Sequence, residues 1–488
     1  MKIFVSKLVM FFLVLLIALC LCCAEKNQEA DNSAAVEAKQ EETEPNAVAK
    51  IGDYTIKKEE LEKRLMEELH PKPYEFGSET ETPDAKAVLM KMIAEKAMVM
   101  EARGQNYLEE ETTKAAVKRF TETRLVNLML TTYLQGKITV TDSEIDEQIK
   151  SNPKLDRERA KAMLTRAKSG KLIEQYYNEL YIKFHVQKLS ENFSKAAQIH
   201  QRLLFYPKEP RKVGYIRISQ IKNDLTPEEK NIVLAMYDNG KVTLKDWFDA
   251  LCEMSPPSRP RDLNTLKGVE KLLDRSLMMP IFVSEAKLRG FDKDENLLQQ
   301  VKEYEDDELL NKARREKTKD ITGPIAEEQI IDYFNKNKEA FGSLNIDQIW
   351  CQDLKTAQKA KSELDKGKDF ESVKQTYSLQ KNLSPFYTYP SGEGMFFKDL
   401  WKGEPNEVVG PLKGFYGDGF KWRIVKILEK KPGTIKEYPD DMKRNIEMRM
   451  LEEQRNKVLD KYRKDLLKKY SYKIYADRIR DIDPLDIP

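Results

Sequence analysis

Residues 117–127 read VKRFTETRLVN, and residues 301–311 read VKEYEDDELLN. Both stretches begin with valine and lysine and then place an aromatic residue fourth, a leucine ninth and an asparagine eleventh. Further matches surround this pair, in the same order in each half of the chain. An ordered series of this kind is not expected by chance, so it predicts that the chain contains two copies of one helical module.

The matches before this pair share a strand-like segment that leads into a helix. Residues 54–61 and 242–248 have this form, with an extended stretch followed by charged residues at a helix start. An amphipathic helix follows in each copy, at 88–103 and at 269–290. The second helix is about one turn longer and contains Pro280, which is expected to kink or break it.

The matches after this pair lie in two long charged helices. Lys183-Phe184 ends the first helix and Lys469-Tyr470 ends the second, with a tyrosine two helical turns before each lysine. The chain therefore has the order A–C, then A–B–C, in which A is the repeated module, C is a returning helix and B is an extra block. Because a returning helix can fold back on the A block before it, we expect each C block to close its own A block.

The expected boundaries follow from these matches and from shifts in composition. They are a signal segment at 1–22, a flexible tether at 23–46, the first A block at 47–152 and its C block at 153–207, a connector at 208–233, the second A block at 234–339, the B block at 340–433, the second C block at 434–475 and a tail at 476–488. A turn at Pro207-Lys-Glu-Pro210 marks the joint between the copies.

The bulk composition is that of a mainly helical protein. Of the 488 residues, 34% are charged and 40% are hydrophobic, with 20 glycines, which suits long solvated helices better than a sandwich or barrel. The 84 basic and 82 acidic residues leave a net charge of +2, and charges of opposite sign are finely mixed. Such a chain has no bulk field that attracts nucleic acid, so no nucleic-acid partner is expected.

The N-terminus has the features of a secretory signal. Lys2 and Lys7 precede an almost wholly apolar stretch at 8–21. Cys22 and Cys23 follow this stretch directly. This end resembles a bacterial lipoprotein box, in which one cysteine is lipidated and becomes the new N-terminus. Cys23 is favoured because a bulky leucine precedes Cys22. An ordinary signal peptide and an uncleaved anchor are the alternatives.

The B block differs in character from the blocks around it. A strand-like stretch at 344–350 precedes two helix-like stretches at 355–366 and 370–377, and a segment rich in glycine, proline and aromatic residues follows at 384–394. A second strand at 422–427 closes the block. This order predicts a small α+β domain on helical arms.

Motifs in the B block resemble those of the parvulin prolyl isomerases. The helix pair within 360–378 is similar to the parvulin helix pair, and 406–411 and 423–427 are similar to the closing segments of that family. The A blocks resemble the N-terminal chaperone modules of SurA, PrsA and PpiD proteins, so that the resemblance covers most of residues 47–475. It implies a mainly α fold with duplicated SurA-N-like helical modules and an inserted parvulin-like α+β domain.

The resemblance implies an exported protein that binds unfolded chains and belongs to a family that isomerises X–Pro bonds. The barrier to that reaction is roughly 18–20 kcal/mol of amide resonance. Parvulins lower it with two histidines and a nearby Asp or Cys, beside Met and Phe side chains. By position these polar groups fall on Gln348, Arg423 and Pro385, and no histidine lies in the B block. Weak or absent isomerase activity is therefore expected.

Two residues near these positions leave alternatives open. Cys351 could replace the Asp or Cys of the family, but it follows the wrong strand. Arg423 could be a cation in a pocket, but an arginine at a strand edge is more often solvated.

The apolar half of a parvulin site is retained. Eight residues could form a groove for proline-rich or aromatic peptide, namely Phe386, Tyr387, Tyr389, Met395, Phe396, Phe397, Leu400 and Trp401. The alternative is that they fill the core of this small domain.

No cofactor and no metal site are expected. Beyond the N-terminal segment, where Cys20 and Cys23 happen to have this spacing, the chain lacks a CxxC motif, and it also lacks a Walker pattern and a dinucleotide-binding glycine pattern. His185 and His200 are too far apart to form a helical metal pair, and each is expected to be a surface or a satisfied core residue. Cys252 and Cys351 are expected to be buried apolar residues rather than a disulfide.

Together these features predict a lipid-anchored chaperone that is exported across a bacterial plasma membrane and acts in the periplasm or cell envelope. Its clients would be unfolded or proline-containing polypeptides of secreted or outer-membrane proteins, bound through several weak apolar contacts. The alternatives are an active prolyl isomerase with non-standard residues and a structural or assembly lipoprotein with one defined partner. The oligomeric state stays open.

Overall fold

The computed structural model describes residues 45–70, 82, 84–206, 214–337, 341–417, 419–433 and 440–486. These residues form two compact units. Unit 1 comprises the described residues from Glu111 to Glu305, and unit 2 comprises those up to Glu110 together with those from Asp306 onward. The expected signal segment and Cys23 lie outside the described residues. Within the described part, no helix has both the length and the apolar character needed to cross a membrane.

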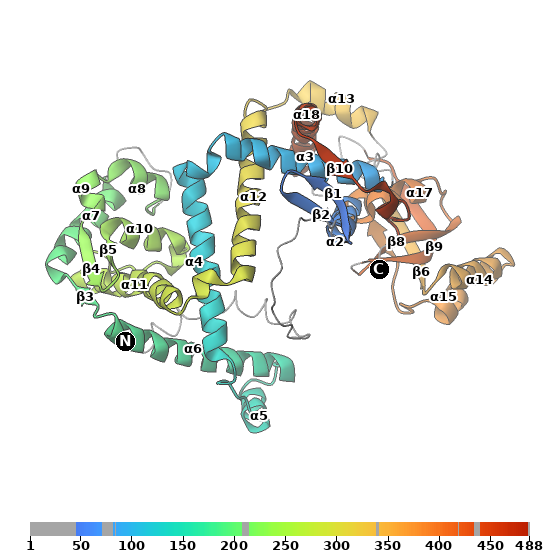
Figure 1. Ribbon diagram of the computed structural model, residues 1–488. Coiled ribbons are helices and arrows are strands. Elements are labelled where there is room, and N and C mark those ends of the chain that lie inside the picture. The colour runs from blue at the N-terminus through green and yellow to red at the C-terminus, as the bar shows by residue number, and fades with distance from the viewer. Residues whose placement is uncertain are drawn as a thin grey trace, which may run out of the picture. The chain divides into compact units, whose positions relative to one another are not determined.

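Unit 1 consists mostly of helices, with one small sheet (Figure 1). Its elements are α4 (Glu111–Leu134), α5 (Asp142–Ser151), α6 (Arg157–Lys183), β3 (Gln187–Lys188), η2 (Ser190–Asn192), α7 (Phe193–Phe205), α8 (Ile218–Asp224), α9 (Pro227–Lys230), β4 (Val233–Tyr237), β5 (Gly240–Thr243), α10 (Leu244–Glu253), η3 (Pro256–Ser258), α11 (Leu266–Leu288), η4 (Phe291–Lys293) and the start of α12 (Glu295–Thr318).

Helix α11 lies at the centre of unit 1 and packs against α4, α6, α7 and α10. The Trp247 indole N–H donates a hydrogen bond of 3.0 Å to the Val269 carbonyl and so ties α10 to α11. Pro280 lies inside α11, which continues to Leu288, so the expected break does not occur. Leu277 and Ile281 beside it are fully buried, and this packing offsets the backbone hydrogen bond that proline cannot make.

Unit 2 contains both ends of the described chain. Its elements are β1 (Ala47–Ile51), β2 (Tyr54–Lys57), α2 (Lys58–Leu69), α3 (Ala85–Gly104), η1 (Tyr107–Glu109), the rest of α12, α13 (Glu327–Lys336), β6 (Ser343–Cys351), α14 (Leu354–Asp365), α15 (Phe370–Tyr377), β7 (Phe386–Thr388), α16 (Pro390–Glu393), η6 (Gly394–Phe396), α17 (Phe397–Trp401), β8 (Val408–Tyr416), β9 (Gly419–Lys431), α18 (Asp440–Lys469), β10 (Tyr472–Ile474) and η8 (Ala476–Arg478). The predominance of helix with small antiparallel sheets confirms the predicted fold class.

The C blocks are exchanged between the two A blocks. Helix α18 packs on α3 and strand β10 pairs with β1, whereas α6 packs on α11 and β3 pairs with β4. The expectation that each A block is closed by its own C block is therefore wrong. The residue boundaries of the blocks remain a prediction.

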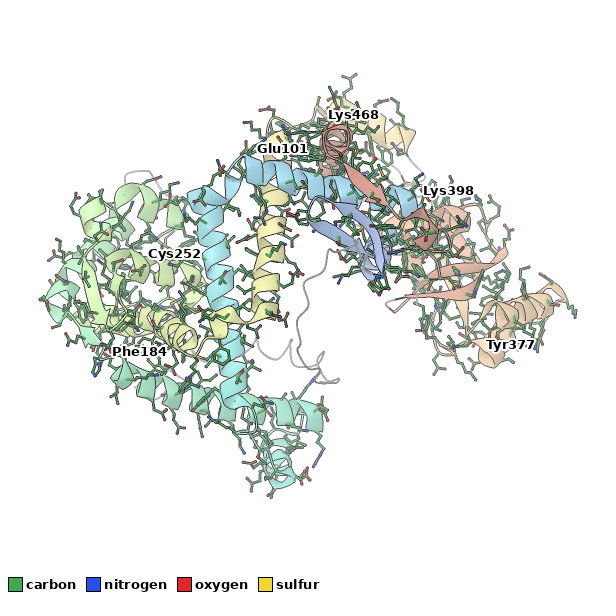
Figure 2. All side chains as sticks on the ribbon, in the orientation of Figure 1. Glu101, Phe184, Cys252, Tyr377, Lys398 and Lys468 are labelled. Carbon is green, nitrogen blue, oxygen red and sulfur yellow. The ribbon has the colours of Figure 1, made fainter. Side chains whose placement is uncertain are left out.

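Matched residues make the same contacts in both exchanged pairs. Glu285, near the end of α11, forms an ion pair with Lys183 at 2.5 Å. Glu101, near the end of α3, forms the equivalent ion pair with Lys469 at 2.5 Å. Figure 2 labels Glu101 together with Lys468, the neighbour of Lys469. The lysine of each pair is at least half exposed, whereas Glu285 is buried and Glu101 is partly exposed.

The stretches 117–127 and 301–311 lie on α4 and α12. Phe120 and Tyr304, the fourth residue of each stretch, stack with their ring centroids 4.0 Å apart. Equivalent positions of the two stretches thus contact each other within unit 1.

The B block forms a four-stranded antiparallel sheet in the order β7-β6-β9-β8. Helices α14 and α15 lie beside each other (Figure 1), and their side of the sheet buries Ile349, Cys351, Ala357, Ala360, Phe370, Val373 and Ile424. Helix α17 packs against the sheet in a second core, which consists of Leu344, Ile346, Phe397, Leu400, Val425 and Ile427. The expected α+β part is therefore present, with two strands, β7 and β8, that were not predicted.

Because the C blocks are exchanged, a stability loss caused by reversing the charge at Glu101 should be restored by reversing the charge at Lys469 and not at Lys183. Glu101→Lys should lower the free energy of unfolding by about 1 kcal/mol, because it places two ammonium groups together at a partly exposed site. Lys469→Glu in the same chain should restore most of this loss, whereas Lys183→Glu should add a second loss. Urea denaturation of the three variants measures this. Rescue by Lys183→Glu would contradict the exchanged pairing.

His200 on α7 is buried against aromatic rings instead of being satisfied by hydrogen bonds. Its ring lies 6.1 Å from Trp247 and 6.4 Å from Phe248, measured between centroids. Its Nδ1 is buried without a hydrogen-bond partner among the described residues. Burial, with a smaller contribution from Arg259, lowers the pKa of His200 from 6.5 to about 4.

This pKa predicts a loss of stability in mild acid. Below about pH 6.5 the unfolded chain binds a proton at His200 that the folded chain does not bind until about pH 4, so the free energy of unfolding falls as the pH falls through this window. The loss should reach about 1–3 kcal/mol near pH 4. His200→Met should remove this slope, and His185→Gln, which changes an exposed ring, should keep it. Denaturation between pH 4 and 7 measures both.

Candidate functional site

Two of the three predicted catalytic positions contact each other in the sheet of the B block. Gln348 lies on β6 and Arg423 on β9, and the antiparallel register pairs Arg423 with Trp350 and Gln348 with Val425. Positions two residues apart on a strand share a face, so Gln348 and Arg423 are diagonal neighbours. Arg423 Nη1 donates a hydrogen bond of 2.9 Å to Gln348 Oε1.

A carboxylate that was not predicted completes this cluster. Glu393, the last residue of α16, forms an ion pair with Arg423 Nη2 at 2.5 Å. Its carboxylate also accepts a hydrogen bond of 2.9 Å from Thr388 Oγ1. Arg423 is 1% exposed and Glu393 is 6% exposed. Arg423 is therefore not a solvated strand-edge residue, because a buried guanidinium requires a charged partner and Glu393 supplies it.

Trp350 and Gly414 leave room for the Arg423 side chain inside the domain. The guanidinium lies over the Trp350 ring, with its carbon 5.0 Å from the ring centroid. A Cβ atom at Gly414 on β8 would collide with the guanidinium, so this position of β8 has room only for glycine. In sequence, Gly414 precedes an ordinary Phe-Tyr-Gly turn, so nothing at that level indicates its role.

The cluster of Gln348, Glu393 and Arg423 has little capacity for acid–base chemistry. Gln348 has no ionisable group, and the Nη atoms of Arg423 are bonded to Gln348 and Glu393. The Glu393 carboxylate is occupied by Arg423 and Thr388. Most polar atoms of the cluster thus bond to one another, although Arg423 Nε is buried without a hydrogen-bond partner among the described residues.

The third predicted position does not belong to the cluster. Pro385 is exposed just before β7. The segment before Pro385 is bonded to α15, because the buried Lys374 of that helix donates a hydrogen bond to the Leu383 carbonyl. Lys374 also forms an ion pair of 2.5 Å with Asp347. No motif in the sequence indicated this second buried ion pair.

The predicted peptide-binding residues separate into exposed and buried groups. Phe386, Tyr387 and Tyr389 are 37%, 42% and 52% exposed, at and beside the edge strand β7. The Tyr387 hydroxyl donates to Glu429 and accepts from Lys431. These three exposed aromatic residues are called the β7 surface below. Leu354 and Leu379 are further exposed apolar residues of the B block.

The other predicted residues mostly fill the core. Phe397 and Leu400 belong to the apolar core under α17, and Trp401 stacks on Phe397 with a centroid distance of 5.5 Å. Met395 is half-buried. Phe396 is buried against Phe415 and Phe420, at centroid distances of 5.2 and 5.9 Å. The last two rings were not predicted, although an aromatic pair around the glycine-rich turn of a hairpin is a signal that sequence reasoning can use.

The thiols have no active role in this geometry. Cys351 is fully buried, and burial raises its pKa to about 11, so it is no stand-in for the missing Asp or Cys. Cys252 and Cys351 are both free, and they lie in different units. Within the described residues, no group of three or more acidic, cysteine or histidine side chains is arranged to hold a metal ion.

No protein-family model matches the chain. In sequence it is similar to the foldase protein PrsA of Caldanaerobacter subterraneus subsp. tengcongensis, with 24% identity over 233 residues, which cover 43% of this chain and 72% of that protein. It is also similar to foldase protein PrsA 3 of Bacillus anthracis, with 25% identity over 201 residues, which cover 39% of this chain and 68% of the relative.

Two solved structures overlap with about half of the chain. A structure described as a SurA-like chaperone of Campylobacter jejuni has 16% identity and a TM-score of 0.24, and the match covers 48% of this chain and 96% of that one. PrsA from Bacillus subtilis has 21% identity and a TM-score of 0.17, and the match covers 51% of this chain and 95% of that one.

The buried cluster predicts a stability effect that depends on charge balance. Arg423→Met should lower the free energy of unfolding of the B block by about 3 kcal/mol, because it leaves the Glu393 carboxylate buried without a charged partner. Replacing both residues, with Arg423→Met and Glu393→Met, should recover most of the loss. Three of the four tryptophans, Trp350, Trp401 and Trp422, lie in this block, so tryptophan fluorescence in urea reports its unfolding.

A matched control is Lys402→Met, which breaks an ion pair with Asp399 whose side chains are 67% and 60% exposed. Its effect should stay below about 0.5 kcal/mol. If Arg423→Met had as small an effect as this control, the ion pair would not be the structural element described here.

Proposed function

We propose that this relative of the PrsA foldases and SurA-like chaperones binds unfolded polypeptides outside the cytoplasm and assists their folding without isomerising X–Pro bonds. The sequence relatives are named foldases. The chain has a mainly helical fold with a small α+β part, as expected for this group. Binding of unfolded clients is the function that these properties share.

The observation that carries the proposal is the buried ion pair between Arg423 and Glu393. Arg423 stands at one of the two positions where the histidines of the family are expected, and it also donates a hydrogen bond to Gln348, which stands at the other. Catalysis requires groups that bind the twisted amide more tightly than the planar amide. Groups that are buried and bonded to one another do not meet this requirement. A role in holding clients therefore fits the B block better than a role in isomerisation.

The β7 surface supports client binding. Phe386, Tyr387 and Tyr389 offer three exposed rings within one short segment. Strand β7 is an edge of the sheet, where an extended client can add main-chain hydrogen bonds to the apolar contacts. Several weak contacts of this kind favour many clients over one.

Export and anchoring complete the proposal. The positive and apolar N-terminal segment would direct the chain across the plasma membrane. Lipidation of Cys23 would then hold it at the cell envelope, and the polar residues up to Asn46 would act as a tether. A single acyl chain anchors weakly, whereas the several chains of a lipoprotein anchor stably.

The proposal predicts client protection without isomerase turnover. The full chain in lipid nanodiscs should suppress the aggregation of a chemically unfolded client and leave the cis-to-trans rate of a short Xaa–Pro peptide unchanged. The triple variant Phe386→Ser, Tyr387→Ser and Tyr389→Ser should suppress aggregation several-fold less well, because it removes the apolar contacts of the β7 surface. Light scattering and a proline-isomerisation assay measure these two effects.

A control with Ile182→Ser and Leu288→Ser changes apolar residues that are 75% and 62% exposed in unit 1, and it should behave like the unmodified chain. Faster isomerisation that disappears when the B block is deleted would instead make the protein an enzyme with non-standard residues. Failure to protect any client, together with co-purification of one defined complex, would favour an assembly lipoprotein.

A further inference from the structure

A histidine from the first A block lies on the aromatic rings of the B block. The His70 ring stacks on Phe415 with centroids 4.8 Å apart and an interplanar angle of 22°. It also lies nearly parallel to Phe420, at 6.5 Å and 20°. Both partners pack against Phe396, and these three phenylalanines are called the aromatic cluster.

The aromatic cluster is held firmly by its own domain. Phe415 and Phe420 are directly paired across the β8–β9 hairpin, with their rings 5.4 Å apart. Phe396 belongs to η6 and is 5% exposed, so it forms the floor of the cluster. Phe415 and Phe420 are half-buried with His70 in place. The cluster therefore presents a preformed apolar face to whatever ring lies on it.

His70 is attached to a different part of the fold. It is the C-cap residue directly after α2, and its backbone N–H donates a hydrogen bond of 3.2 Å to the Met66 carbonyl. Helix α2 is anchored by Leu61 and Leu65, which belong to the same buried apolar core as Leu89 of α3. The His70 ring is itself only half-buried and carries polar nitrogens, so its exposure to water costs less than that of a phenylalanine ring.

We propose that His70 is a built-in cover of the aromatic cluster and that an aromatic or proline ring of an unfolded client displaces it. The inference rests on the proposed function, because it assigns a second client contact to a protein that binds unfolded chains. The cluster already accepts a flat ring of this chain face-on. Aromatic rings prefer such offset-stacked contacts, and grooves lined by aromatic rings also accept proline.

The cover has a measurable consequence because His70 and a client ring compete for one place. The free chain spends part of its time with the cluster covered, and client affinity is reduced by that fraction. Removing the imidazole should tighten client binding by about 2- to 10-fold, which is the range that one aromatic stacking contact corresponds to. A more apolar ring at position 70 should have the opposite effect.

The test uses the full chain in lipid nanodiscs and a fluorescein-labelled client, reduced and carboxymethylated α-lactalbumin, which stays unfolded. Fluorescence anisotropy should show tighter binding for His70→Ala and weaker binding for His70→Phe. His185→Ala, which removes the exposed ring that bonds to Asp238 in unit 1, is the matched control and should bind like the unmodified chain. Phe415→Ser in the His70→Ala chain should abolish the gain.

The outcomes separate this inference from the proposed function. If the unmodified chain prevents client aggregation but His70→Ala and His70→Phe bind the client equally well, the cover is ruled out and the chaperone function stands. If no variant binds the client and aggregation is not prevented, both are ruled out. Circular dichroism melting of each variant establishes that it is folded, and a Phe415→Leu chain replaces Phe415→Ser if the latter unfolds.

Discussion

Unit 2 depends on the carboxylate of Glu95, which lies on α3 and is 8% exposed. Arginines from three other segments converge on it, namely Arg64 of α2 at 3.2 Å, Arg314 of α12 at 2.5 Å and Arg463 of α18 at 3.7 Å. A shielded guanidinium that loses its carboxylate leaves an uncompensated charge, which costs far more than the intact pair contributes. Segments from the beginning, the middle and the end of the chain are thus required together.

The contact between α13 and α18 anchors both ends of the B block. Helix α13 precedes the block and α18 follows it, and Phe334 packs with Ile446 in a small apolar core. Glu453 on α18 accepts a hydrogen bond of 2.6 Å from the Tyr333 hydroxyl on α13. The α+β domain is therefore held between two helices that contact each other. The β7 surface and the aromatic cluster therefore belong to a domain whose two ends are both anchored.

Within the B block, Gln348 and Arg423, two of the positions expected to be catalytic, take part in a buried group of bonded polar side chains. The ion pair between Arg423 and Glu393 is buried, whereas a site for isomerisation would need groups open to a substrate. The exposed rings of the β7 surface would supply the apolar contacts of the proposed client binding. If clients bind as proposed, His70 on the aromatic cluster would compete with a client ring, and client affinity would depend on the position of this one side chain.

The sequence by itself determined the helical class, the α+β block and the absence of histidines at Gln348 and Arg423, because these follow from local periodicity and motif spacing. It did not determine which C block closes which A block. Lys183 and Lys469 occupy matched positions, so either could pair with Glu101, and only the path of the chain in three dimensions selects Lys469. Tertiary structure also decided that Phe397 is core while Phe386 is exposed, and that Glu393 meets Arg423. Burial and long-range charge pairing depend on which distant segments meet, and no local pattern records that.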